Sequence, residues 1–107
     1  MLLIFISSCN QTNSYTNQKI PVIGFLDFIQ DPTIELAKDG FFDALKENGF
    51  STTDSTIEIV YANAQGDIPT LNQSCDFILS KNPVLIGTNV TLSTITAVKR
   101  TTEVPIF

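Results

Sequence analysis

The pentapeptide at residues 63–67, Asn-Ala-Gln-Gly-Asp, holds side chains suited to binding a small polar molecule. Asn63 and Gln65 each carry an amide that donates and accepts hydrogen bonds, and Gly66 lets a ligand approach the backbone closely. An apolar run with strand character precedes these residues and a helical pattern follows them. The same residues also suit an ordinary strand-to-helix turn in which Asp67 caps the helix. Taken alone, the pentapeptide leaves a ligand site and a simple turn both open.

Two further polar loops are expected beside this one, because apolar runs also precede residues 27–31 and 87–91. Parallel strands end at one edge of a sheet, and open α/β folds bind ligands there. Helix N-termini at that edge favour an anion such as an α-carboxylate. Asp27 or Asp31 could face an ammonium group, and Phe28 could stack on an apolar side chain. The candidate ligand-binding residues are Asp27, Phe28, Asn63, Gln65, Gly66, Thr88 and Asn89.

The strands that would carry these loops are short and apolar. Residues 20–26, 56–61, 83–87 and 104–107 are rich in Val, Ile, Leu and Phe, as expected of strands buried on both faces. Amphipathic helical patterns alternate with them. The alternation predicts an α/β fold: a parallel sheet of about four strands in the order 2-1-3-4, with helices on both faces.

Three helices are expected between these strands. The first starts with Asp31 as N-cap and Pro32 in its first turn, and it ends before Gly49. The second spans residues 67–80, and the third follows residues 88–91. Their apolar faces are expected to comprise, in chain order, Ile34, Ala37, Phe41, Ala44 and Leu45; Ile68, Leu71, Cys75, Ile78 and Leu79; and Leu92, Ile95 and Val98. Cys75 is therefore expected to be a core residue without reactivity.

Composition argues against several functions. Lys plus Arg is 6 and Asp plus Glu is 11, giving a net charge of -5, so nucleic acid is not an expected partner. The chain has no His and only two distant Cys, so neither a metal site nor a disulfide framework is expected. It also lacks a phosphate-loop lysine motif, a Gly-x-Gly-x-x-Gly motif and a Gly-x-Ser-x-Gly motif. We expect no enzyme activity and no cofactor.

The N-terminus has the pattern of a bacterial lipoprotein signal. An apolar run at residues 1–6 is followed by Ser7, Ser8 and Cys9, although the run is shorter than the ~7–15 residues usual in a secretory signal. Cleavage before Cys9 would leave a cysteine to carry lipid, and residues 10–19 would form a polar tether. We expect residues 1–9 to be the signal segment and the protein to be exported and lipid-anchored at the cell envelope, on the periplasmic side or the cell surface. A frayed apolar N-terminus with a chance Cys is the alternative.

Three motifs resemble those of the substrate-binding lipoproteins of bacterial ABC importers, in the group that binds aromatic amino acids such as tryptophan and tyrosine. They are Asp-Pro-Thr at residues 31–33 with the helix at 40–50, Tyr-Ala-Asn-Ala-Gln-Gly-Asp at 61–67, and Val-Pro-Ile at 104–106. The resemblance covers residues 20–107. It implies a type I periplasmic-binding fold, and permease and ATPase subunits as partners. The ligand contacts that it implies are Asn63, Gln65, Gly66, Thr88 and Asn89.

The function that this resemblance implies is solute capture for an ABC importer, with a small zwitterion such as an aromatic amino acid as ligand. Better-known members carry Gln near the position of Asp27, so this residue is a departure that leaves the ligand's identity open. The fold has two lobes around a hinged cleft, and we expect residues 20–107 to be part of the N-terminal lobe. The chain alone should then bind its ligand no tighter than about millimolar. The alternatives are a phosphoacceptor or nucleotide-binding flavodoxin-like domain and an inactive fragment of the binding protein.

Overall fold

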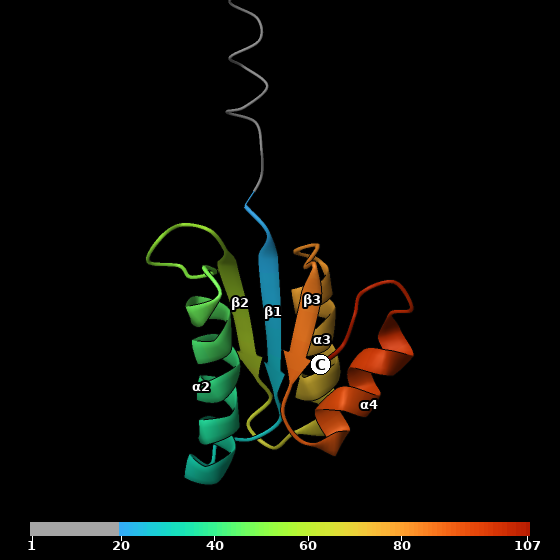
Figure 1. Ribbon diagram of the computed structural model, residues 1–107. Helices are drawn as coiled ribbons and strands as arrows, with labels where there is room; N and C mark the ends of the chain where they lie inside the picture. Colours follow the sequence, from blue (N-terminus) through green and yellow to red (C-terminus); the bar gives the residue numbers. More distant parts are fainter. Residues whose placement is uncertain (1–19) are drawn as a thin grey trace, which may run out of the picture.

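The computed structural model describes residues 20–107. The predicted signal segment, Cys9 and the tether lie outside this part. Strands and helices alternate along it (Figure 1) in the order β1 (Val22–Asp27), α2 (Pro32–Glu47), β2 (Glu58–Asn63), α3 (Ile68–Leu79), β3 (Leu85–Thr88) and α4 (Thr91–Arg100). The predicted alternation is confirmed. The strands start and end slightly later than predicted, so Asp27, Asn63 and Thr88 are each the last residue of a strand.

The three strands form a parallel sheet in the order β2-β1-β3. Helix α2 covers one face, and α3 and α4 cover the other (Figure 1). This order and the two-sided covering were predicted. The predicted fourth strand is reduced to a single parallel bridge between Ile86 and Ile106. The N–H of Ile86 donates to the carbonyl of Pro105 and that of Phe107 donates to the carbonyl of Ile86, but Pro105 has no N–H to extend the ladder.

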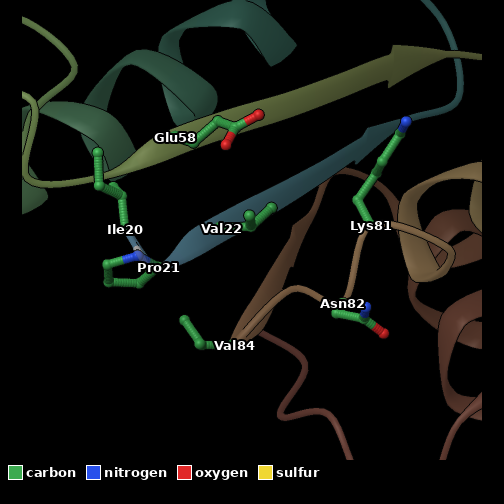
Figure 2. A pocket seen from close by; sticks show the side chains of 7 residues that line it. All are labelled: Ile20, Pro21, Val22, Glu58, Lys81, Asn82 and Val84. Atoms are coloured by element: carbon green, nitrogen blue, oxygen red, sulfur yellow. The ribbon is translucent and has the colours of Figure 1, made fainter. Parts of the chain in front are cut away.

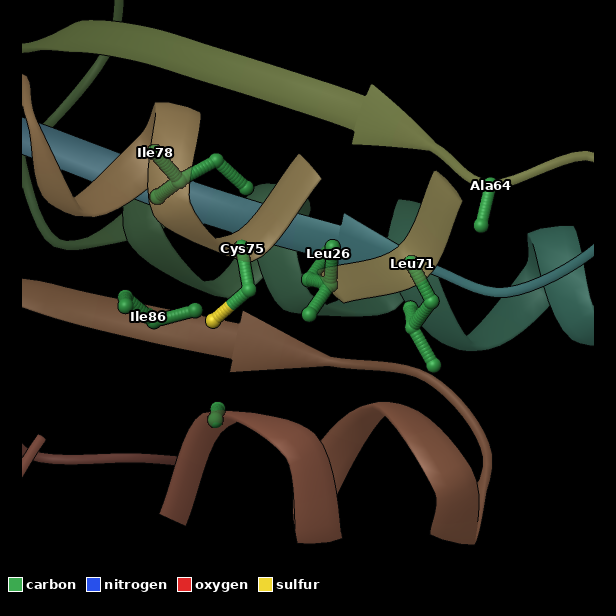
Figure 3. Packing of buried hydrophobic residues seen from close by; sticks show 7 residues of the cluster. Leu26, Ala64, Leu71, Cys75, Ile78 and Ile86 are labelled. Carbon is green, nitrogen blue, oxygen red and sulfur yellow. The ribbon is translucent and has the colours of Figure 1, made fainter. Parts of the chain in front are cut away.

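The main core lies between the sheet and α3 with α4. Figure 3 shows side chains of β1, β3 and α3 meeting there. Its fully buried members are Leu26, Ala64, Leu71, Cys75, Ile78, Ile86 and Ala97. Burying a Leu or Ile side chain completely contributes about 1.5–3 kcal/mol, so this cluster is the principal source of stability. The predicted burial of Cys75 is confirmed.

Helix α4 packs through a different face from the one predicted. Leu92, Ile95 and Val98 are 42%, 43% and 54% exposed, whereas Ser93 and Ala97 are fully buried. Small side chains at this spacing let the helix backbone lie close to its neighbours. The prediction was wrong because it followed the larger apolar side chains, and Ser93 and Ala97 give almost no hydrophobic signal.

Helix α2 has the predicted ends. The carboxylate of Asp31 accepts hydrogen bonds from the N–H groups of Thr33 (2.8 Å) and Ile34 (3.4 Å). At the other end, the N–H groups of Gly49 and Phe50 donate to carbonyls of the last turn, and Gly49 has φ 92°, which is a Schellman ending. The inward face is only partly as predicted. Ala37 and Ala44 are exposed, whereas Ile34, Phe41 and Leu45 are half-buried together with Lys38 and Phe42.

The rings of Phe41 and Phe42 connect α2 to the sheet. Their centroids lie 5.3 Å and 5.4 Å from the ring centroid of Phe25 in β1. Such aromatic pairs contribute beyond the area that they bury. None of the helices within residues 20–107 has the length and apolar character needed to cross a membrane.

Candidate functional site

The carboxyl edge of the sheet, where β1, β2 and β3 end, gathers the three predicted loops (Figure 1). These loops are residues 28–31, 64–67 and 89–90. Backbone hydrogen bonds join two of them to each other and hold two of them against the end of β1. The N–H of Gly66 donates to the carbonyl of Phe28 (2.7 Å), that of Ala64 to Asp27 (2.9 Å), and that of Asn89 to Leu26 (3.1 Å). The predicted polar loops therefore lie together at the end of β1.

The turn after β2 presents an amide to solvent. The side-chain oxygen Oδ1 of Asn63 accepts a hydrogen bond from the N–H of Gln65 (2.7 Å), and the N–H of Asp67 donates to the carbonyl of Ala64 (3.0 Å). Gln65 and Gly66 have φ 57° and 79°, as a type I′ turn requires. Gly66 adopts this conformation readily, whereas it is uncommon for Gln. Both residues are exposed, so the side chain of Gln65 and the backbone of Gly66 are available to a ligand.

Asp27 is fully buried beneath this surface. Its Oδ1 accepts a hydrogen bond from the side-chain amide of Asn89 (2.7 Å), and its Oδ2 accepts one from the hydroxyl of Tyr61 (2.6 Å). Asn89 is also buried, and its amide donates in addition to the carbonyl of Ile34 (3.3 Å). In this conformation, both carboxylate oxygens of Asp27 are therefore occupied by protein donors rather than facing an ammonium group. The side chain of Asn89 therefore links Asp27 at the end of β1 to Ile34 in α2.

Tyr61 was not among the predicted site residues. It lies beside Phe25 in the parallel register, and its ring stacks on the Phe25 ring with centroids 6.4 Å apart. Tyr61 precedes Asn63 by two residues on β2, so the two side chains share one face of the sheet. This two-residue spacing is the sequence feature that could have identified Tyr61 as a neighbour of the site. The register that brings Tyr61 to Asp27 is not visible in the sequence.

The other two predicted residues are half-buried. Phe28 packs against the core cluster. The hydroxyl of Thr88 lies 2.7 Å from that of Thr94 in α4 and donates to the carbonyl of Phe107 (3.1 Å). Thr88 therefore helps to hold the start of α4 and the chain end beside β3. Of the seven predicted residues, Gln65 and Gly66 are the most accessible.

The three helix N-termini at the carboxyl edge differ in what caps them. The carboxylates of Asp31 and Asp67 cap α2 and α3, and the hydroxyl and N–H of Thr70 lower the pKa of Asp67 by hydrogen bonding. Helix α4 begins after Val90, with no side chain capping its first turn. The positive helix end that remains open to an anion is thus that of α4.

Val90 has an unusual backbone conformation, with φ 62° and ψ 158°. A β-branched residue in this region is strained by about 1–3 kcal/mol, and such residues cluster at ligand-binding positions. This conformation was not predicted, because Val is a poor N-cap residue and rarely has positive φ.

Apolar side chains are also exposed around the carboxyl edge. Ile29, Val90 and Leu92 are 43%, 38% and 42% exposed, and Ile68 at the start of α3 is 55% exposed. An open helix N-terminus, an exposed amide and exposed apolar groups therefore occur along one edge. This combination suits a small amphiphilic ligand with a carboxylate.

A cavity of about 740 Å³ lies at the opposite edge of the sheet, where the strands begin. Figure 2 shows Glu58 and Lys81 on either side of Val22 in this cavity. Its remaining lining residues are Ile20, Pro21, Asn82 and Val84. Helices that start at the carboxyl edge end here, and helix C-termini disfavour a carboxylate. Chemistry therefore favours the carboxyl edge as a carboxylate site, although this cavity lies at the opposite edge.

In the part of the chain that the structure describes, neither the possible metal ligands nor the thiol of Cys75 has a reactive arrangement. Within residues 20–107, no three His, Cys, Asp or Glu side chains lie together as a metal ion would require. Burial raises the pKa of the Cys75 thiol, so it stays protonated and poorly nucleophilic. Hydrogen-bond donors, acceptors and apolar surface are what the carboxyl edge offers.

Comparison with known proteins agrees with a binding role. The family model described as "ABC transporter substrate binding protein" matches residues 19–107. The Tyrosine-binding protein of Clostridioides difficile (strain R20291) is 30% identical over 101 residues, which cover 94% of this chain and 29% of that protein.

Two solved structures are also similar. A substrate binding protein with adhesive properties from Clostridium difficile, in a ligand-free, open structure, has 31% identity and a TM-score of 0.77, covering 82% of this chain and 30% of that chain. An ABC domain in complex with L-Trp from Streptococcus pneumonia has a TM-score of 0.76 over 82% of this chain and 29% of that chain. At 23% identity, the latter likeness concerns the fold alone. The chain thus spans less than a third of the length of each of these relatives.

Proposed function

We propose a ligand-binding role at the carboxyl edge for this chain, which belongs to the family of ABC transporter substrate-binding proteins. The ligand class is a small zwitterion, with an aromatic amino acid as the leading candidate. The observation that carries the proposal is the occurrence, along one edge, of an uncapped helix N-terminus, an exposed amide and exposed apolar side chains. The name of one relative, a tyrosine-binding protein, supports the same class.

Each part of such a ligand has a counterpart at this edge. The α-carboxylate would accept hydrogen bonds from the first-turn N–H groups of α4, where the helix dipole favours negative charge. The side-chain carbonyl of Gln65 and the second carboxylate oxygen of Asp31 would face the ammonium group, since the first oxygen already caps α2. The apolar side chain would lie against Ile29 and Val90.

The delivery of the ligand and the anchoring of the protein are further parts of the proposal. Residues 1–9 would act as a lipoprotein signal, residues 10–19 as a tether and residues 20–107 as part of the N-terminal lobe of the binding domain. Lipid on Cys9 would hold the protein at the outer side of the membrane, where it would pass its ligand to an ABC permease and ATPase for import. Mass spectrometry of the mature N-terminus tests this, because an intact Met1 would contradict cleavage before Cys9.

The phosphoacceptor alternative is not favoured by the site. A phosphoacceptor needs an accessible acid at the end of a strand, and Asp27, which ends β1, is fully buried with both oxygens hydrogen-bonded. The β3–α4 loop supplies Asn89 rather than an acid. A binding role accounts for the same residues without further assumptions.

Affinity should be modest for residues 20–107 alone. Gln65 and Gly66 lie on an open surface, whereas good pockets bury ~70–90% of a small ligand. We therefore expect a Kd of about 1 mM, which corresponds to about -4 kcal/mol. Saturation-transfer NMR detects binding in this range. The ligands compared are L-tryptophan, tryptamine, which lacks the carboxylate, and indole-3-propionate, which lacks the ammonium group.

We expect L-tryptophan to bind with the highest affinity and both analogues to bind much more weakly. Gln65→Ala should weaken tryptophan binding by about two- to tenfold, the value of one hydrogen bond of 0.5–1.5 kcal/mol. Gln73→Ala is the matched control, because Gln73 is an exposed amide in the middle of α3. Tryptamine binding as tightly as tryptophan would refute the role of the α4 N-terminus, and no binding of any aromatic ligand would favour the inactive alternative.

A further inference from the structure

A directed chain of side-chain hydrogen bonds runs from the buried Asp27 to the exposed turn at Gln65. The hydroxyl of Tyr61 donates to Asp27 Oδ2 (2.6 Å), the amide Nδ2 of Asn63 donates to the Tyr61 hydroxyl (3.2 Å), and Oδ1 of Asn63 accepts from the N–H of Gln65 (2.7 Å). We propose that Tyr61 is a positioning residue that fixes the orientation of the Asn63 amide and, through it, the turn that presents Gln65. This inference rests on the proposed function, since it assigns the turn a ligand.

The donor and acceptor in each of these hydrogen bonds follow from the number of protons that each group carries. A tyrosine hydroxyl has one proton, and the carboxylate of Asp27 can only accept, so that proton is used at Asp27. Toward Asn63, the hydroxyl can then only accept, and the Asn63 amide must turn its NH₂ group to Tyr61. Oδ1 is thereby directed away from Tyr61, where it meets the N–H of Gln65. The hydrogen bond from the Gln65 N–H favours the same orientation, so loss of the Tyr61 hydroxyl removes one of the two partners that hold the Asn63 amide in place.

The orientation matters because the turn is conformationally demanding. Gln65 has φ 57°, which is uncommon for a residue with a side chain, and Gly66 continues the turn with φ 79°. The hydrogen bond from the Gln65 N–H to Asn63 Oδ1 stabilises this backbone. With the amide reversed, an NH₂ group would face that N–H and the turn would lose its support.

The ring of Tyr61 is held independently of its hydroxyl. It stacks on Phe25, and Nζ of Lys38 lies 4.3 Å from the ring centroid. Lys38 is itself paired with Glu35 (2.7 Å). Desolvation and the hydrogen bond to Asp27 raise the pKa of Tyr61, so the hydroxyl keeps its proton at neutral pH. The substitution Tyr61→Phe should therefore retain the ring position and remove only the hydroxyl.

A purely structural role for Tyr61 makes different predictions from a positioning role. If Tyr61 only donated a hydrogen bond to Asp27, loss of its hydroxyl would lower the overall stability but would not specifically accelerate hydrogen exchange at the Gln65 N–H. The positioning role predicts a specific rescue by Asn63→Asp. A carboxylate presents an acceptor in either orientation, so it supports the Gln65 N–H even when no hydroxyl directs it.

The experiment measures amide hydrogen exchange of Gln65 by NMR in the whole chain. Exchange of this amide should accelerate by about fivefold or more in Tyr61→Phe, as expected for loss of one hydrogen bond, and return to near the original rate in Tyr61→Phe/Asn63→Asp. Tyr15→Phe, at the chain's other tyrosine, is the control substitution. An unchanged Gln65 rate in Tyr61→Phe, or no rescue in the double variant, would overturn the inference.

Two further measurements separate this inference from the proposed function and from misfolding. Tryptophan binding should weaken in Tyr61→Phe by about two- to tenfold and recover in the double variant. If the unaltered chain binds no aromatic ligand, the proposed function fails while the exchange result still decides the orientation of Asn63. If Tyr61→Phe does not fold, the unaltered chain must show a nuclear Overhauser contact between the Asn63 NH₂ protons and the Tyr61 ring, and its absence would overturn the inference.

Discussion

Replacing Asp27 with alanine should be among the most destabilising substitutions at the carboxyl edge. The side chain is fully buried and accepts two short hydrogen bonds, from Tyr61 and Asn89. Hydrogen bonds to a charged group are worth about 1.5–3 kcal/mol each. Removing the carboxylate leaves the donors of Tyr61 and Asn89 without this acceptor, at about 1–3 kcal/mol each. A domain of this size has a total stability of about 5–15 kcal/mol, so Asp27→Ala should remove a large part of it.

Urea denaturation followed by far-ultraviolet circular dichroism measures this loss. Asp27→Asn should be intermediate, because it keeps the shape and one acceptor but turns an NH₂ group toward one of the two donors. Asp31→Ala is the control, since it removes an exposed helix cap worth about 1 kcal/mol. If Asp27→Ala destabilises the chain no more than Asp31→Ala does, the hydrogen bonds of the buried carboxylate contribute little to stability and this prediction is wrong.

Three other outcomes are expected. Gly87→Ala should lower the free energy of unfolding by about 1–3 kcal/mol in the same denaturation assay, because the new Cβ would lie 2.6 Å from a ring carbon of Phe25; an unchanged midpoint would contradict this packing. In a Cys9→Ser chain, which removes the other thiol, Cys75 should react with a thiol reagent only when urea unfolds the chain, and rapid labelling of the folded chain would show that it is accessible. The lowered pKa of Asp67 means that its contribution to stability is present above the unfolded pKa of about 3.9 and is lost as pH falls through the folded value. Acid titrations should show this dependence weakened in Asp67→Asn, and identical curves would refute it.

Local chemistry in the sequence predicted the ends of the helices well. Asp31 before Pro32 marks the start of α2, and Gly49 marks its end, because both signals depend on residues within one turn of the boundary. The order of the strands also followed from alternation and from the handedness of parallel crossovers. These features require no knowledge of which side chains meet.

Features that depend on contacts distant in sequence were not predicted. Asp27 was expected in a loop facing the ligand, but β1 extends to include it and its partners Tyr61 and Asn89 lie 34 and 62 residues away. The inward face of α4 was missed because Ser93 and Ala97 are small. The strained Val90 conformation is imposed by its surroundings and not by its own preference.

The most direct test of the binding site is a ¹⁵N–¹H NMR titration of the chain with L-tryptophan. We expect progressive shifts of the amide signals at the carboxyl edge, at Gln65, Gly66, Asn89 and the first turn of α4. Signals around the cavity at the opposite edge, such as those of Val22 and Lys81, should stay in place. Shifts centred on that cavity, or no shifts at several millimolar ligand, would contradict a ligand site at the ends of the strands.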